Sequence, residues 1–182
     1  MTGRRSRRPR PPLDASSLKE LALAYVARFA TSRAKLGAYL SRKVRERGWA
    51  GDGEPPIDEL VAKAVAAGFV DDSAFALSKA RSLTARGYGS RRVRQALFAA
   101  GIEEADGEAA RAHARQDAVE AALHFARKRR LGPFASDEPD SNAKQKALAA
   151  MVRAGHDFSL SQVIIALGPG APFDPQDLED ER

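Results

Sequence analysis

The sequence of 182 residues predicts an all-α protein, an elongated array of three tandem three-helix repeats with charged disordered tails. Apolar residues recur at the three- and four-residue spacing of amphipathic helices. No stretch alternates apolar and polar residues as a half-buried strand does. One pattern, a large apolar residue four positions before a glycine, occurs three times along the chain. Because three short helices bury their apolar faces poorly alone, we expect the repeats to stack in a row.

The repeated pattern sets the predicted order of elements. Its glycines, Gly48, Gly101 and Gly155, are separated by 53 and 54 residues. Each ends a predicted helix that begins at a capping residue: Ser32, Ser90 and Asn142 respectively. The expected helices cover 17–30, 32–48, 57–67, 73–85, 90–101, 103–115, 115–130, 142–155 and 159–168. The expected division is a basic tail over 1–15, repeats over 16–70, 71–115 and 116–170, and an acidic tail over 171–182.

Local signals support these helix ends. Ser17 with Glu20, and Ser159 with Gln162, have the spacing of a capping box. Pro55-Pro56 precedes an acidic first turn, as is typical of a helix start. Glycine adopts the left-handed conformation that ends a helix, and the predicted stops are Gly48, Gly68, Gly87 and Gly101. The segment 131–141, with two prolines and three acids, is the predicted internal loop.

Composition narrows the class of protein. There are 30 Lys and Arg against 24 Asp and Glu, for a net charge of +6, and no cysteine. The lack of cysteine excludes disulfides, thiol catalysis and cysteine-bound zinc. No apolar run reaches the roughly 18 residues of a membrane span, and the basic start is not followed by the apolar core of a secretory signal. We therefore expect a cytoplasmic monomer.

No group of residues predicts catalysis. The three histidines, His113, His124 and His156, lie far apart in the sequence and are expected at the surface rather than on a metal. A capping role at a helix start explains Asp71-Asp72. Gly87-Tyr88-Gly89 fits neither phosphate-binding glycine motif. The prediction is no enzyme, no metal and no cofactor.

The distribution of charge is more informative than its total. Residues 1–12 carry +5, residues 174–182 carry −4, and the body carries the remaining +5. In the body, cations occupy the early turns of the three middle helices, where the helix dipole disfavours them. They are Arg33 and Lys35, then Arg91, Arg92 and Arg94, then Lys144 and Lys146. With free backbone N–H groups, such turns would bind phosphates or carboxylates; a solvated charged face is the alternative. The same interpretation holds for the basic N-terminal tail, as a nucleic-acid contact or as a solubilising segment.

Tyr88 lies between two turn-forming glycines and beside Arg86. It is predicted either to pack across two helices or to contact a partner, since an aromatic among arginines is a typical hot spot. A secondary basic face comprises Arg42, Lys43, Lys144 and Lys146.

Several of these residues together resemble the bacterial RecX regulatory proteins. The motif runs from Gly68-Phe-Val-Asp-Asp72 through Phe75-Ala76 to Gly87-Tyr-Gly-Ser-Arg-Arg-Val-Arg94, then Leu97 and Gly101-Ile102. It is strong over about 35 residues, and Ser32-Arg33-Ala34-Lys35-Leu36 is similar to the first-repeat motif. With the repeats included, the resemblance extends over roughly 17–167. The third repeat, the longer helix after Ser32 and both tails depart from the family pattern.

The resemblance implies tandem three-helix units that bind RecA recombinase. Family members lodge in the groove of RecA–DNA filaments and restrain ATP hydrolysis, strand exchange and coprotease activity, and hence homologous recombination and the SOS response. We expect the contacts with the RecA filament, and with DNA inside it, at Arg33, Lys35, Arg86, Tyr88, Arg91, Arg92 and Arg94. The alternative is a helical protein that binds nucleic acid nonspecifically and directly, without RecA. No small-molecule substrate or membrane is expected as a partner.

Overall fold

The structure, a computed structural model, describes residues 10–178. Within that range the chain forms nine α-helices and one short 3-10 helix, and no strand. The predicted all-α class is confirmed. The chain divides into two compact units, Met1–Asp71 and Asp72–Arg182, called unit 1 and unit 2 below.

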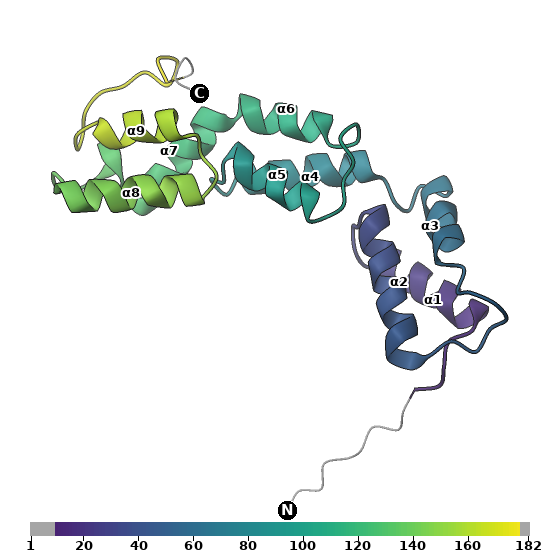
Figure 1. Ribbon diagram of the computed structural model, residues 1–182. Helices are drawn as coiled ribbons and strands as arrows, with labels where there is room; N and C mark the ends of the chain where they lie inside the picture. Colours follow the sequence, from purple (N-terminus) through teal and green to yellow (C-terminus); the bar gives the residue numbers. More distant parts are fainter. Residues whose placement is uncertain (1–9, 179–182) are drawn as a thin grey trace, which may run out of the picture. The chain divides into compact units, whose positions relative to one another are not determined.

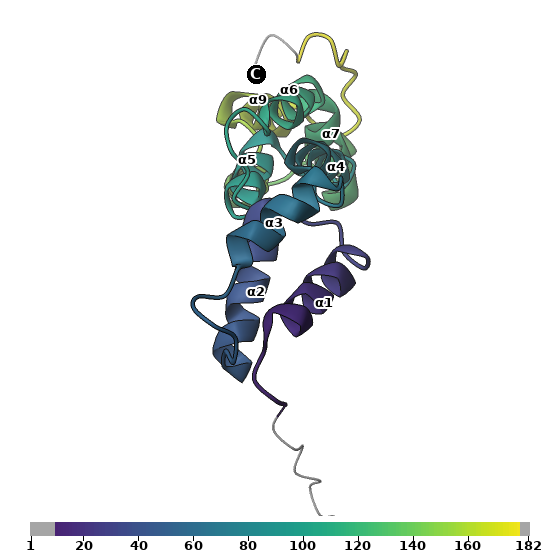
Figure 2. The same cartoon turned by 90° about the vertical axis from the view of Figure 1, so that its right-hand side faces the viewer.

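Unit 1 contains helices α1 (Ala15–Val26), α2 (Arg33–Arg47) and α3 (Ile57–Ala66), which are seen from the side in Figure 2. Leu18 of α1 and Leu36 and Leu40 of α2 are fully buried in their shared core. Leu13, just before α1, is also buried, and its N–H donates to the Gly48 carbonyl at 2.9 Å. The chain before α1 is thereby held against the end of α2.

The first half of unit 2 contains α4 (Asp72–Thr84), α5 (Ser90–Phe98) and α6 (Glu108–Gln116). Their core is built largely of small residues from α4 and α6, with Val93 and Leu97 contributed by α5. Because alanine is small, α4 and α6 can approach closely along their length.

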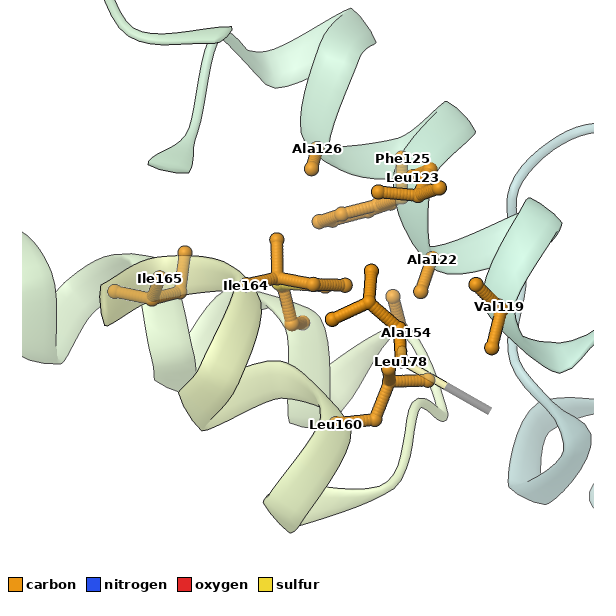
Figure 3. Packing of buried hydrophobic residues seen from close by; sticks show 11 residues of the cluster. Val119, Ala122, Leu123, Phe125, Ala126, Ala154, Leu160, Ile164, Ile165 and Leu178 are labelled. Carbon is orange, nitrogen blue, oxygen red and sulfur yellow. The ribbon is translucent and has the colours of Figure 1, made fainter. Parts of the chain in front are cut away.

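The second half of unit 2 contains α7 (Ala118–Arg129), the 3-10 helix η1 (Gly132–Phe134), α8 (Ser141–Arg153) and α9 (Phe158–Ala166). Figure 3 shows its core, in which Phe125 and Ala126 of α7 face Ile164 of α9. Each of the three buried clusters in the described residues is thus formed mainly by three consecutive α-helices, with Leu13, Val70 and Leu178 added from the segments beside them. The division into three repeats stays a prediction.

Predicted helix ends were confirmed at the glycines and partly wrong at the caps. Gly48, Gly68, Gly87 and Gly101 all have φ between 66° and 84°. Ser32 caps α2 as expected, accepting a hydrogen bond from the Lys35 N–H. Elsewhere the cap lies one to three residues earlier than predicted. Asp14, not Ser17, caps α1; Gly89, not Ser90, precedes α5; Asp140, not Asn142, caps α8; and Asp157, not Ser159, caps α9.

The reason is a choice between neighbouring polar residues. At α1 and α8 an aspartate stands two or three positions before the predicted residue, and an aspartate is at least as good a cap as serine or asparagine. In α1, Ser17 completes a capping box from the other side, because its hydroxyl accepts from the Asp14 N–H. The helix expected over 103–115 begins only at Glu108.

The predicted tails are partly ordered where the structure describes them. Residues 1–9 and 179–182, which hold most of the tail charge, lie outside the described residues. Within the predicted tails, however, Leu13 is buried in unit 1 and Leu178 is 3% exposed in the core of unit 2. Phe173 also packs edge-on against Phe134, with ring centroids 5.9 Å apart. Apolar residues in a charged segment bury themselves when a core edge is near.

In the described part of the chain, no helix is long and apolar enough to cross a membrane. Among the same residues, no group of three or more His, Asp or Glu side chains could hold a metal ion.

Candidate functional site

The Gly87–Gly89 turn joins the two halves of unit 2. The Gly89 N–H donates to the Ala154 carbonyl and the Arg91 N–H to the Gly155 carbonyl, both at 3.1 Å. A Cβ atom on Gly89 would overlap the carbonyl group of Gly155. Only glycine allows the two backbones to come this close. We call this contact the glycine joint.

His156 lies directly behind the glycine joint. It is 2% exposed, and its Nε2 donates to the Gly87 carbonyl at 3.1 Å. Burial lowers the pKa of His156 to about 4, and the bond to the Gly87 carbonyl offsets only part of that effect. The imidazole is therefore neutral at pH 7, and its Nδ1 is buried without a partner among the described residues.

The expectation of surface histidines was therefore wrong for His156. His113 is half-buried, with Nε2 3.2 Å from the Thr84 hydroxyl oxygen, while His124 is exposed as predicted. Sequence reasoning missed His156 because its partner at Gly87 is 69 residues away in the chain.

Tyr88 packs across the two halves of unit 2. Its half-buried side chain contacts both buried clusters of this unit. The guanidinium carbons of Arg86 and Arg92 lie 5.3 and 5.9 Å from the ring centroid. The predicted packing role is confirmed. The packing also fixes the direction of two exposed cations, since guanidinium groups are attracted to the face of an aromatic ring.

The first turns of α5 place Arg91 and Arg94 beside a cavity of about 600 Å³. Both side chains belong to exposed residues, and neither has an ion pair within residues 10–178. Helix α6 contributes Arg111 and Arg115 to the same cavity, with an apolar floor that includes Leu160. Four arginines from two helices therefore surround one hollow.

The two arginines of α6 are already neutralised. Arg111 pairs with Glu104 at 2.9 Å and Arg115 with Glu108 at 3.0 Å. Both pairings lower the charge available to a partner, and the arginines also hold the pKa of the Glu108 carboxyl below its usual range. Within the described residues, the lining arginines without an ion pair are those of α5, while Asp157, the cap of α9, adds one carboxylate to the same cavity. Sequence reasoning missed Arg111 and Arg115, although their four-residue spacing on a predicted helix was a usable signal.

Some of the backbone N–H groups expected to be free in these turns already have partners. Backbone N–H groups at the start of α5 were expected to bind phosphates, but the Arg91 N–H is taken by Gly155 and the Arg92 N–H by Gly89. In α2 and α8 the N–H groups of Lys35 and Ala143 are taken by the capping side chains. An anion at these turns would therefore meet side chains rather than these amides.

The remaining predicted cations form two other sets. In unit 1, α2 carries Arg33 and Lys35 in its first turn, each of which contacts a partner. Arg42 and Lys43, further along α2, share the carboxylate of Glu46 at 3.7 and 2.6 Å. The remaining two are on α8.

On α8, Lys144 pairs with Glu138 at 2.6 Å, whereas Lys146 is exposed. In unit 2 the structure brings Arg86 and Arg92 to the ring of Tyr88, and Arg91 and Arg94 to the cavity. The cations of α2 belong to a separate unit.

Comparison with known proteins supports a specific family. Residues 71–110, which include α4 and α5, match the family model described as the second three-helix domain of RecX. A regulatory protein RecX from Myxococcus xanthus is 33% identical over 176 residues, covering 91% of this chain and 94% of the relative. A second, from Agrobacterium fabrum, is 35% identical over 98 residues, covering 54% of this chain and 52% of the relative.

Solved structures agree in fold. The crystal structure of RecX from Lactobacillus salivarius matches with a TM-score of 0.65 and 21% identity, over 83% of this chain and 94% of that one. A second crystal structure of a regulatory protein RecX matches with a TM-score of 0.58 and 20% identity, over 82% and 72%.

The fold defines a class of all-α proteins built from small helical bundles rather than a particular activity. The relatives are more specific, because one of them matches nearly the whole chain. The chain belongs to the family of RecX regulatory proteins.

Proposed function

We propose that this protein is a non-enzymatic cytoplasmic regulator that binds RecA and RecA–DNA filaments. In this proposal it inhibits their ATPase, strand-exchange and coprotease activities, and thereby regulates DNA repair and the SOS response. The family supports the regulatory role, since each curated relative above is named a regulatory protein.

The observation that carries the proposal is the pair of uncompensated arginines on α5. Arg91 and Arg94 border the cavity without an ion pair among the described residues, in the segment that matches the family model. Guanidinium groups bind carboxylates and phosphates through paired hydrogen bonds. The backbone that carries them is held in place, because the glycine joint fastens the start of α5 to Ala154 and Gly155. A rigid, positive surface of this kind suits an acidic partner surface.

Arg86, Arg92 and Tyr88 extend this surface, and we include all three among the proposed contacts. The ring of Tyr88 directs both guanidinium groups. Arg33 and Lys35 are proposed as contacts of unit 1, and Arg42, Lys43, Lys144 and Lys146 as secondary ones. Glu46 and Glu138 already neutralise part of the secondary set, so we expect it to contribute less.

The test is the DNA-dependent ATPase of the cognate RecA, titrated with this protein. The double charge reversal Arg91→Glu with Arg94→Glu should raise the concentration needed for half-inhibition roughly tenfold or more, because it places like charges against the partner. The matched control is Lys79→Glu with Lys128→Glu, which reverses two exposed charges of unit 2 on α4 and α7, neither of which lines the cavity. Equal potency of the two double variants would remove α5 from the interface, and no inhibition by the wild-type protein would refute the function.

A further inference from the structure

Unit 1 contains an aromatic cluster that the proposed function does not use. The rings of Tyr25 and Tyr39 are stacked, with centroids 4.1 Å apart and planes inclined by 20°. Phe29 extends the cluster, with its centroid 5.3 Å from that of Tyr25. The three rings come from the end of α1, the following loop and the middle of α2.

Core packing explains only part of this cluster. Tyr25 and Tyr39 are half-buried and contact the core of unit 1. Phe29 is 49% exposed and lies outside that core, and its ring contacts in the described structure are Tyr25 and Arg28. A phenyl ring held at the surface by a second ring and a guanidinium group leaves part of its own face for a partner.

Cations surround the rings. The Arg28 guanidinium carbon lies 5.4 Å from the Phe29 centroid, and Arg42 and Lys43 lie 5.7 and 5.8 Å from the Tyr39 centroid. The last two cations share one carboxylate, Glu46. Arg28 is exposed and has no ion pair in the part of the chain that the structure describes. Three cations against one carboxylate leave the cluster positive.

We propose that Tyr25, Phe29 and Tyr39, with Arg28, Arg42 and Lys43, form a binding surface for single-stranded nucleic acid. Exposed aromatic faces stack with unpaired bases, and nearby cations bind the phosphates between them. Duplex DNA fits less well, because its bases are already stacked on one another. An acidic protein surface would account for the cations but not for the half-exposed phenyl ring beside Arg28. This inference goes beyond the proposed function, since it requires no RecA.

The experiment measures binding of the full chain to a fluorescent oligothymidylate of about 20 nucleotides, by anisotropy and without RecA. An abasic phosphodiester strand of the same length is the second probe. Any contact of the five arginines of residues 1–12 with phosphates would be common to both strands, so the ratio of affinities isolates the contribution of the bases. Phe29→Ala should weaken binding to the oligothymidylate about tenfold and leave abasic binding unchanged. Arg28→Ala should weaken both.

The matched control is Phe69→Ala, which removes another phenyl ring of unit 1 that is 57% exposed. It should leave both affinities unchanged, and circular dichroism should show equal helix content in all variants. Arg91→Glu with Arg94→Glu should retain oligothymidylate binding, which separates this inference from the proposed function. Equal affinity of the wild-type protein for the two strands, or equal effects of Phe29→Ala and Phe69→Ala, would overturn it. So would a Phe29→Ala variant that loses only RecA binding.

Discussion

Unit 1 and unit 2 differ in what holds their exposed cations in place. In unit 1, the cations around the aromatic cluster contact side chains that are near in sequence, such as Arg42 with Tyr39 and Glu46. In unit 2, Arg91 and Arg94 follow a backbone contact between Gly89 and Gly155. The surface of unit 1 depends on packing between neighbouring turns, whereas that of unit 2 depends on a long-range backbone contact. Substitutions at the glycine joint should therefore affect one unit and spare the other.

The largest expected effect is that of Gly89→Ala. A Cβ atom there would overlap the Gly155 carbonyl, and backbone on both sides cannot shift freely. We expect unit 2 to lose about 3 kcal/mol or more of its free energy of unfolding. Trp49 is the single tryptophan of the chain and lies in unit 1. In a denaturant titration the fluorescence of Trp49 should keep its wild-type midpoint. The circular dichroism signal, which includes the helices of unit 2, should begin to fall at a lower denaturant concentration.

The control for that prediction is Gly68→Ala in unit 1. Gly68 has φ of 74°, but nothing lies within 4 Å of an added Cβ. Only backbone strain is expected, about 1 kcal/mol, and it should appear in the Trp49 signal. If Gly89→Ala shifted both signals by the same amount, the two units would unfold as one, and the contrast between them would not hold.

The second effect concerns pH and His156. The pKa of His156 is about 4 in the folded protein, whereas an unburied histidine, as in the unfolded chain, has a pKa of 6.5. Between these values the unfolded chain binds a proton that the folded chain does not, so stability falls as pH falls from 6.5 to 4. The loss should reach about 3 kcal/mol in unit 2. The unfolding midpoint that Trp49 fluorescence reports for unit 1 should not show this loss.

The comparison variant is His156→Gln, whose amide can still donate to the Gly87 carbonyl. Carboxylates also titrate near pH 4, so the informative quantity is the difference between the two proteins at each pH. We expect the wild-type free energy of unfolding to decrease more steeply below pH 6.5. Parallel pH profiles would show that folding does not lower the pKa of His156, and that the neutral imidazole adds nothing to the stability of the glycine joint.

The two units also differ in how much of them the sequence could predict. Helices, their glycine ends and the cation-bearing turns follow from local spacing, and Ser32 as the cap of α2 was confirmed. The caps before α1, α8 and α9 were misplaced because two polar residues compete within one turn. The glycine joint and the buried His156 could not be predicted, since both depend on contacts between residues far apart in the chain. Periodicity carries no information about such pairs.

The smallest expected effect compares two serines that occupy similar places in the sequence. Ser32 caps α2, with its hydroxyl accepting from the Lys35 N–H at 3.3 Å. Ser90 instead donates its hydroxyl proton to the Ala114 carbonyl of α6 at 2.7 Å. Substitution of either serine by alanine should lower the free energy of unfolding by about 1 kcal/mol, in the Trp49 signal for Ser32→Ala and in circular dichroism for Ser90→Ala.

Aspartate distinguishes the two roles, because a carboxylate accepts hydrogen bonds but cannot donate them. At position 32 it can still accept from the Lys35 N–H, so Ser32→Asp should recover part of the stability that Ser32→Ala loses. At position 90 it would place a negative charge against the Ala114 carbonyl, so Ser90→Asp should be at least as unstable as Ser90→Ala. Recovery by aspartate at both positions would mean that Ser90 caps α5 after all. The contact between α5 and α6 would then depend on apolar packing, to which Val93 and Leu97 contribute.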